Sequence, residues 1–128
     1  MSQQKYKTES RSWLVSRRNS FRFAIRGILS LFRTEPHAWI HLAFTILVFI
    51  LTIRFGLTGR EMAPLVIVIG MVWMAELFNT AIERIVDFIS PSYHQQAGII
   101  KDIAAGAVLV AAITAVITGA IIFLPKIF

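Results

Sequence analysis

The sequence predicts an all-α integral membrane protein, with three transmembrane helices preceded by an N-terminal amphipathic helix on the membrane surface. Apolar residues make up 56% of the 128 residues, whereas charged residues make up only 16%. Long stretches carry no charge: 18 uncharged residues separate Glu35 from Arg54, and 23 separate Asp102 from Lys126. About 20 helical residues span the hydrocarbon core of a bilayer, so these stretches have the length of transmembrane helices.

The surface helix is predicted over residues 12–34. Five apolar residues at spacings of seven, four, three and four share one face of this helix: Leu14, Phe21, Ile25, Ile28 and Phe32. Arg18, Arg22 and Arg26 form an adjacent stripe, which suits a helix lying among lipid headgroups. Two interpretations remain: the helix only anchors the protein, or its arginines also contact a substrate.

The transmembrane helices are predicted at about 37–54, 62–89 and 101–124 within one domain, 1–128. The second of these contains Glu76. We still count it as a span, because Glu61 and Arg84 bound it a membrane's width apart and an acidic residue inside a membrane is more often functional. Residues 56–59 and 90–100 are predicted to be the connecting turn and loop.

The distribution of basic residues predicts the orientation. Ten of the thirteen lysines and arginines lie before the first span or between the second and third, and three lie on the other side. The positive-inside rule therefore predicts a multi-pass protein with a cytoplasmic N-terminus. No signal peptide is visible, so we expect the first span to be retained. Most of the chain is membrane-embedded, which argues against nucleic acid as a partner.

Four polar residues of the second span are the candidates for a functional site. Glu76, Asn79, Glu83 and Asp87 are three, four and four residues apart, so they share one helix face that crosses the cytoplasmic boundary of the membrane. Glu76 lies roughly two turns inside that boundary. Carboxylates at positions i and i+4 repel each other, so this face needs a cation.

Two kinds of cation fit this face. Lys101 with Arg84 would give a structural ion network, whereas oxygen ligands alone suit Mg²⁺. Lys101 and Asp102 begin the third span at the depth of Glu83 and Asp87, so a magnesium–nucleotide complex there would support phosphoryl transfer. The alternatives are a small ion-coupled transporter and a structural membrane subunit.

Two further features limit the chemistry. No glycine-rich phosphate loop occurs, which excludes a P-loop enzyme and a protein kinase fold. The histidines His37, His41 and His94 are not at metal-ligand spacing from one another, so we expect structural roles for them.

Several motifs resemble the small prokaryotic diacylglycerol kinase and undecaprenol kinase family. They are Glu-Leu-Phe-Asn-Thr-Ala-Ile-Glu at 76–83, Val86-Asp87, Tyr93-His94 and Lys-Asp-Ile-Ala-Ala-Gly-Ala-Val at 101–108. The resemblance covers about residues 18–125. It implies three transmembrane helices and a surface helix, a homotrimer with active sites shared between subunits, and a location in the bacterial inner membrane. It also implies transfer of the γ-phosphate of ATP, with Mg²⁺, to a membrane lipid alcohol, either diacylglycerol or undecaprenol.

The resemblance also implies residue roles. Glu76 would be the catalytic general base on the lipid hydroxyl, and Asn79 would support it. Four residues would contact ATP: Glu83, Asp87, Lys101 and Asp102. Glu83 and Glu35 would bind the metal. Many family members carry a further acidic metal ligand where this chain has Leu29 and Ser30. Three alternatives follow: Glu35 replaces that ligand, nucleotide and water oxygens complete the metal shell, or the metal site is weaker.

Overall fold

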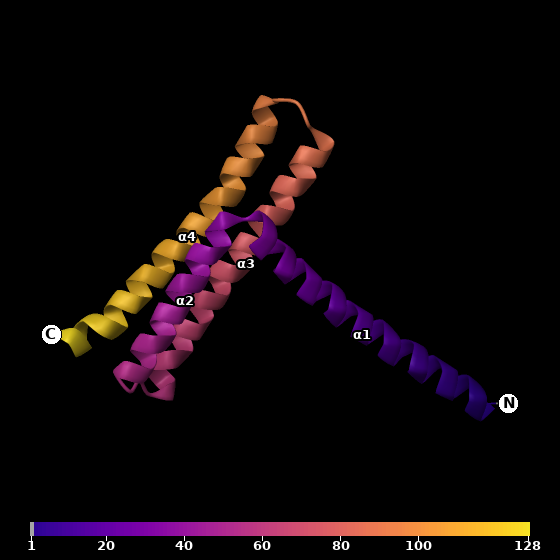
Figure 1. Cartoon of the computed structure of the whole chain (residues 1–128), viewed down its shortest axis with the longest axis horizontal. Coiled ribbons are helices and arrows are strands. Elements are labelled where there is room, and N and C mark those ends of the chain that lie inside the picture. Colours follow the sequence, from indigo (N-terminus) through magenta and orange to yellow (C-terminus); the bar gives the residue numbers. More distant parts are fainter. Residues whose placement is uncertain (1) are drawn as a thin grey trace. The chain divides into compact units, whose positions relative to one another are not determined.

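The computed structural model describes the backbone of residues 2–128, together with the side chains of Trp13 and residues 15–128. Within these residues every regular element is an α-helix (Figure 1). The helices are α1 (Ser2–Thr34), α2 (Pro36–Arg54), α3 (Gly59–Ile89) and α4 (Gln95–Ile127). The last three are each long and apolar enough to cross a membrane. The predicted all-α class with three spans is therefore confirmed.

Helix α1 belongs to a compact unit of its own, separate from the unit Glu35–Phe128. It begins at Ser2, ten residues before the predicted start, because no glycine or proline interrupts residues 2–12. The side chain of Leu14 lies outside the described residues. Phe21, Ile25 and Ile28 of the predicted apolar face are exposed, as expected for a face that contacts lipid.

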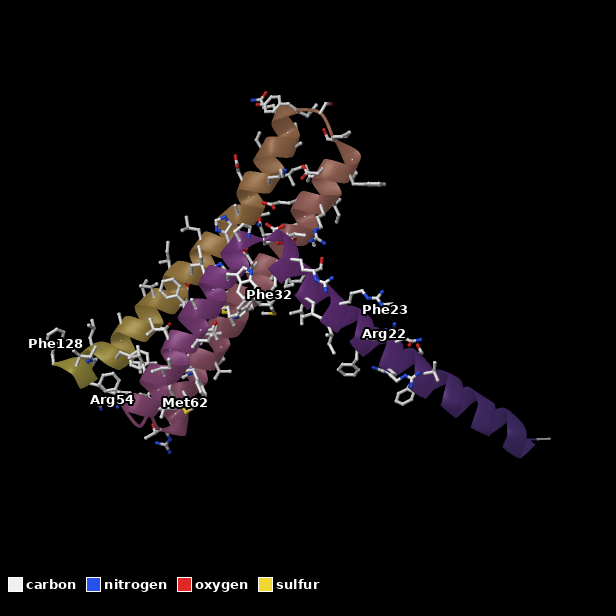
Figure 2. All side chains as sticks on the ribbon, in the orientation of Figure 1. Arg22, Phe23, Phe32, Arg54, Met62 and Phe128 are labelled. Carbon is white, nitrogen blue, oxygen red and sulfur yellow. The ribbon has the colours of Figure 1, made fainter. Side chains whose placement is uncertain are left out.

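Two arginines of α1 lie over aromatic rings of the same helix. The Arg17 guanidinium is 5.0 Å from the centre of the Trp13 ring, and that of Arg26 is 5.6 Å from the centre of the Phe23 ring. Arg22 and Phe23 mark this part of the helix in Figure 2. A surface that mixes cations and aromatic rings suits the headgroup region, where both kinds of side chain are favoured.

A tight turn joins α2 to α3. Gly56 has φ +60°, a conformation that favours glycine. Its N–H donates to the Ile53 carbonyl and the Leu57 N–H donates to the Thr52 carbonyl, which is the Schellman pattern that ends helices. Glu61 Oε2 then accepts hydrogen bonds of 2.8 Å from both the backbone N–H and the hydroxyl of Thr58, so α3 begins at Gly59.

The connection between α3 and α4 is shorter than predicted. The loop covers only residues 90–94, and the segment 95–100, which was predicted to be part of it, is helical. The cause is a cap: the Nδ1 atom of His94 accepts a hydrogen bond of 3.2 Å from the Gln96 N–H at the start of α4. His94 thus has a structural role, and Lys101 lies inside α4 rather than at its beginning.

The C-terminal end of α4 lies beside the turn between α2 and α3. The Lys126 Nζ atom lies 2.8 Å from Glu61 Oε1, and the rings of Phe55 and Phe123 lie 6.1 Å apart. Figure 2 accordingly shows Phe128 at the same end of this unit as Arg54 and Met62. These contacts fix the lengthwise register of α4 on α3.

Helix α3 is the central element of the unit, because it packs against both α2 and α4. Its buried residues form one stripe along the helix: Leu65, Val68, Val72, Glu76, Thr80 and Val86. Most large apolar side chains of the three helices point outward and are exposed, such as Phe49 and Val116. This is the pattern of a membrane protein, whose outer faces contact lipid tails as apolar as leucine.

Candidate active site

Glu76 lies within the buried stripe of α3 and is only 4% exposed. It follows Val72 by one helical turn and precedes Thr80 by another. Burying a carboxylate among apolar side chains costs free energy unless the carboxylate has a polar partner. An ionisable residue in this position of a membrane helix is therefore a candidate for function rather than packing.

The partner of Glu76 comes from α2. The Nε2 atom of His41 lies 3.7 Å from Glu76 Oε2, and both side chains are largely buried. The imidazole also meets the ring of Trp73 edge-on, with the ring centres 6.3 Å apart. Trp73 in turn donates a hydrogen bond of 3.1 Å to the Thr45 hydroxyl, which donates to the His41 carbonyl. These contacts join α2 to α3 at the level of Glu76.

One turn further along α3, Asn79 holds Glu83. The Asn79 side-chain N–H donates a hydrogen bond of 3.3 Å to Glu83 Oε1. The other polar atom of this amide, Oδ1, is buried and has no hydrogen-bond partner among the described residues. The hydroxyl oxygen of Thr80 is likewise buried and has no hydrogen-bond partner among the described residues. Buried polar atoms are nearly always satisfied in proteins, so these two oxygens indicate a place for a ligand atom or a water molecule.

Near the end of α3, Asp87 pairs with α4. Its Oδ1 atom lies 2.7 Å from the Nζ atom of Lys101, which is a short, charge-assisted hydrogen bond. Both groups are partly exposed, so this pair is open to water and to exchange of partners. Asp102 is also exposed, one residue further along α4.

The predicted polar face of α3 therefore forms a row of three contacts rather than one cluster. Glu76 contacts α2, Asn79 contacts Glu83 within α3, and Asp87 contacts α4. The last acid, Asp87, follows the first, Glu76, by eleven positions, which corresponds to about 16 Å of helical rise. We call this row, Glu76 to Asp87 with Lys101, the polar row.

Glu35 stands at the same level as the middle of the polar row. It is the N-cap residue of α2, six residues before His41, while Glu83 follows Glu76 by seven residues on the antiparallel α3. Both acids therefore lie about 10 Å beyond the His41–Glu76 contact along their helices. This level is the one at which a metal ion held by Glu35 and Glu83 would lie.

The described residues contain no group of three or more acidic, histidine or cysteine side chains close enough to hold a metal ion by themselves. Magnesium, however, needs only one or two carboxylates when phosphate oxygens and water complete its shell. Glu83 supplies one such carboxylate, and the unpartnered amide oxygen of Asn79 belongs to the residue that contacts it. The predicted roles of Glu35 and Glu83 as metal ligands remain predictions.

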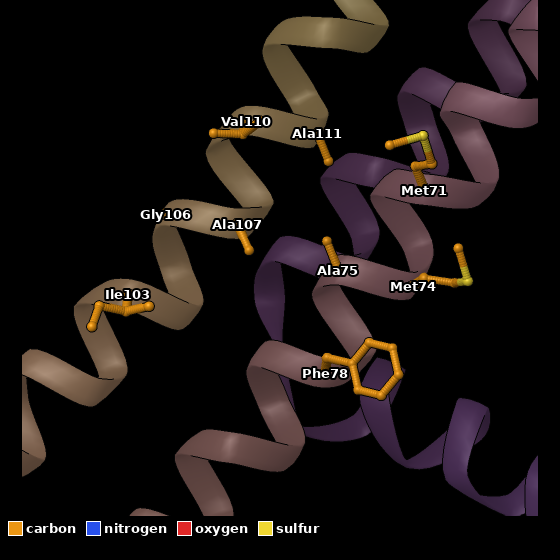
Figure 3. A pocket seen from close by; sticks show the side chains of 9 residues that line it. All are labelled: Met71, Met74, Ala75, Phe78, Ile103, Gly106, Ala107, Val110 and Ala111. Carbon is orange, nitrogen blue, oxygen red and sulfur yellow. The ribbon is translucent and has the colours of Figure 1, made fainter.

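A groove runs between α3 and α4 beside the polar row (Figure 3). It has a volume of about 530 Å³ and is lined only by apolar residues: Met71, Met74, Ala75, Phe78, Ile103, Gly106, Ala107, Val110 and Ala111. Glu76 is absent from this lining, because it faces α2 instead. The groove therefore offers a hydrocarbon surface next to the buried acid, on a different side of the same helix.

The contact of His41 with Glu76 was not predicted from the sequence. The contact depends on the register of α2 against α3, which no local pattern encodes. A signal was nevertheless present: His41 is an ionisable residue in the long uncharged stretch that follows Glu35. Ionisable residues within membrane spans have functional partners more often than not.

Comparison with known proteins identifies the group to which this chain is related. The model of the family described as "Prokaryotic diacylglycerol kinase" matches residues 22–123. A diacylglycerol kinase of Synechocystis is 41% identical over 107 residues, which cover 83% of this chain and 61% of that protein. An undecaprenol kinase of Bacillus subtilis is 42% identical over 107 residues, which cover 84% and 87%.

A third relative, a diacylglycerol kinase of Haemophilus influenzae, is 32% identical over 120 residues, which cover 92% of this chain and 98% of that protein. The chain thus spans less than two thirds of the cyanobacterial relative but nearly the whole of the Haemophilus protein. The matched region includes α2, α3 and all residues of the polar row. The chain belongs to the prokaryotic diacylglycerol kinase family.

Proposed function

We propose that this chain is a lipid kinase that transfers the γ-phosphate of ATP, with Mg²⁺, to the hydroxyl of diacylglycerol or undecaprenol. The observation that carries the proposal is the carboxylate of Glu76, buried in an apolar helix at the inner end of the polar row. A base at this depth suits an acceptor hydroxyl that belongs to a lipid. The family and the names of the relatives support the same activity.

Glu76 acts as the general base in this proposal. Its carboxylate takes the proton of the lipid hydroxyl while the hydroxyl oxygen bonds to the γ-phosphorus and the bond from that phosphorus to the ADP oxygen breaks. The products are the phosphorylated lipid and ADP, and the proton on Glu76 passes to water. Asn79 supports the site by holding Glu83.

The outer part of the polar row binds the nucleotide. Lys101 leaves Asp87 to contact the phosphates, an exchange favoured by the partial exposure of both groups. Asp87 and Asp102 are then available to other groups of ATP. Glu83 and Glu35 would hold the magnesium ion, which neutralises phosphate charge when it is bound.

The position in the cell and the assembly are part of the proposal. Eight lysines and arginines precede α2, and Arg84 and Lys101 lie in the adjoining ends of α3 and α4, which supports a cytoplasmic N-terminus in the bacterial inner membrane, with the polar row on the cytoplasmic side. The whole chain acts as one membrane kinase domain. We also propose a homotrimer, which light scattering of the protein in detergent would test.

Phosphorylation of lipids by the purified full-length chain tests the proposal. The protein in mixed micelles is given radiolabelled ATP and Mg²⁺ with diacylglycerol, undecaprenol, or a lipid that lacks a hydroxyl group. We expect label in one or both alcohols, and none in the third lipid. Glu76→Gln should lower this rate at least about 100-fold, since a general base contributes that much or more.

Glu61→Gln is the matched control, because Glu61 is an acid of the same helix at the opposite end. It should retain most of the activity. Lack of labelling of any lipid by the unaltered protein would overturn the proposal, as would full activity of Glu76→Gln. Ion flux across vesicles without lipid labelling would instead support the transporter alternative.

A further inference from the structure

The structure places the imidazole of His41 against the buried carboxylate of Glu76. The Nε2–Oε2 distance is 3.7 Å, and the two side chains are 18% and 5% exposed. The lysine of the polar row pairs with Asp87, about 16 Å of helical rise beyond Glu76. His41 therefore offers the buried acid a polar partner at its own level.

The imidazole packs against a tryptophan that is itself held by a hydrogen bond. Trp73 packs edge-on against the ring from α3. The hydroxyl of Thr45 ties the Trp73 indole N–H to the carbonyl of His41, so the ring and its packing partner belong to one hydrogen-bonded unit. A side chain held in this way loses little entropy when it orients a neighbour, which is the property of a preorganised site.

The contact uses one oxygen of the carboxylate. The structure records Oε2 as the atom facing His41. A carboxylate that serves as a base needs only one oxygen to accept the proton, and it performs best when the other oxygen is held in place. The length of 3.7 Å exceeds a hydrogen bond, as is common for catalytic contacts in proteins without bound substrate.

We propose that His41 is a positioning residue for Glu76. Through Nε2 it holds one oxygen of the carboxylate and leaves the other to accept the proton of the lipid hydroxyl. This inference rests on the proposed function of Glu76 as the general base. It assigns a role in the reaction to a histidine whose sequence context indicated only a structural one.

A pair of amide substitutions tests the inference, because the two amides differ in reach. The side-chain nitrogen of Gln can occupy the position of Nε2 of histidine, whereas that of Asn stops near Nδ1. We expect His41→Gln to retain most of the lipid phosphorylation rate and His41→Asn to lower kcat about tenfold or more. The KM for ATP should stay unchanged in both variants, because the nucleotide end of the polar row is intact.

The control is His37→Asn. His37 is an exposed histidine one turn before His41 on the same helix, and its substitution should leave kcat unchanged. Thermal unfolding and oligomer size in detergent show whether each variant folds. If His41→Asn fails to fold, His41→Leu, which preserves packing against Trp73 but removes the polar atoms, takes its place.

A double variant separates positioning from packing. In the Glu76→Gln background, His41→Asn should lower the residual rate no further, because residues that act as a unit are not additive. Equal rates for His41→Gln and His41→Asn, or a full additional loss in the double variant, would overturn the inference. The role of Glu76 as general base is tested by Glu76→Gln alone. If Glu76→Gln is inactive and His41→Asn has a normal rate, the proposed role of His41 is wrong and that of Glu76 stands.

Discussion

The α3–α4 hairpin is closed at its two ends by the same kind of ion pair. Asp87 and Lys101 lie 2.7 Å apart at one end, and Glu61 and Lys126 lie 2.8 Å apart at the other. In both pairs α3 supplies the acid and α4 the base. The acids are 26 residues apart and the bases 25, or about 39 Å of helix. This exceeds the hydrocarbon core of about 30 Å, so in a bilayer centred on the hairpin both pairs would lie at headgroup level.

The two ends differ in what lies between the ion pair and the middle of the membrane. Inward from Asp87 come Glu83, Asn79 and Glu76, whereas the stripe inward from Glu61 is apolar as far as Val72. On α4, the hydroxyls of Thr114 and Thr118 are satisfied by carbonyls of their own helix. The two ends thus carry the same kind of ion pair, and they differ in that only the end with the polar row holds the candidate site.

The strongest test of this difference between the two ends is to replace each lysine in turn. Lys101→Met should lower lipid phosphorylation about 100-fold at subsaturating ATP, because it removes the charge proposed to bind the phosphates. Lys126→Met should have little effect, although it breaks an ion pair of the same length. The measurement is kcat/KM for ATP in both variants. Equal losses would mean that both lysines act only on the packing of the hairpin.

A second prediction concerns the metal. Glu83→Gln keeps the size of the side chain and can still contact Asn79, but it removes the negative charge. The Mg²⁺ concentration for half-maximal activity should rise about tenfold, as expected when one charged contact is lost. A magnesium titration of the phosphorylation rate measures this. Glu61→Gln is the control at the opposite end, and an unchanged titration curve for Glu83→Gln would contradict the role as a metal ligand.

Much of this comparison could be predicted from the sequence, because it depends on distances along single helices. The spacing of charges located the three spans, and the spacing of Glu76, Asn79, Glu83 and Asp87 placed them on one helix face. Lys101 was expected at the depth of Asp87, and the structure records an ion pair between them.

The remaining features depend on contacts between helices or on single caps. The meeting of His41 with Glu76 requires the packing of Trp73 and Thr45 across α2 and α3, which no spacing within one helix encodes. The early start of α4 depends on the hydrogen bond from Gln96 to the side chain of His94, a residue that also fits a loop. Sequence periodicity thus defines which residues share a face, and tertiary packing decides which faces meet.

The smallest expected effect concerns the ion pair that carries no chemistry. Glu61→Lys combined with Lys126→Glu exchanges the two charges, so the pair can form again, while either change alone leaves two like charges facing each other. We expect each single variant to lower the Tm in detergent by only a few degrees, because partly exposed ion pairs contribute little. The double variant should recover part of that loss, although Glu61 also caps α3 through Thr58 and lysine cannot accept those hydrogen bonds.

Recovery of Tm together with unchanged lipid phosphorylation would show that this end only fixes the register of α4 on α3. A large loss of activity in the double variant would instead mean that the register at this end controls the alignment of Lys101 with the polar row, about 39 Å away.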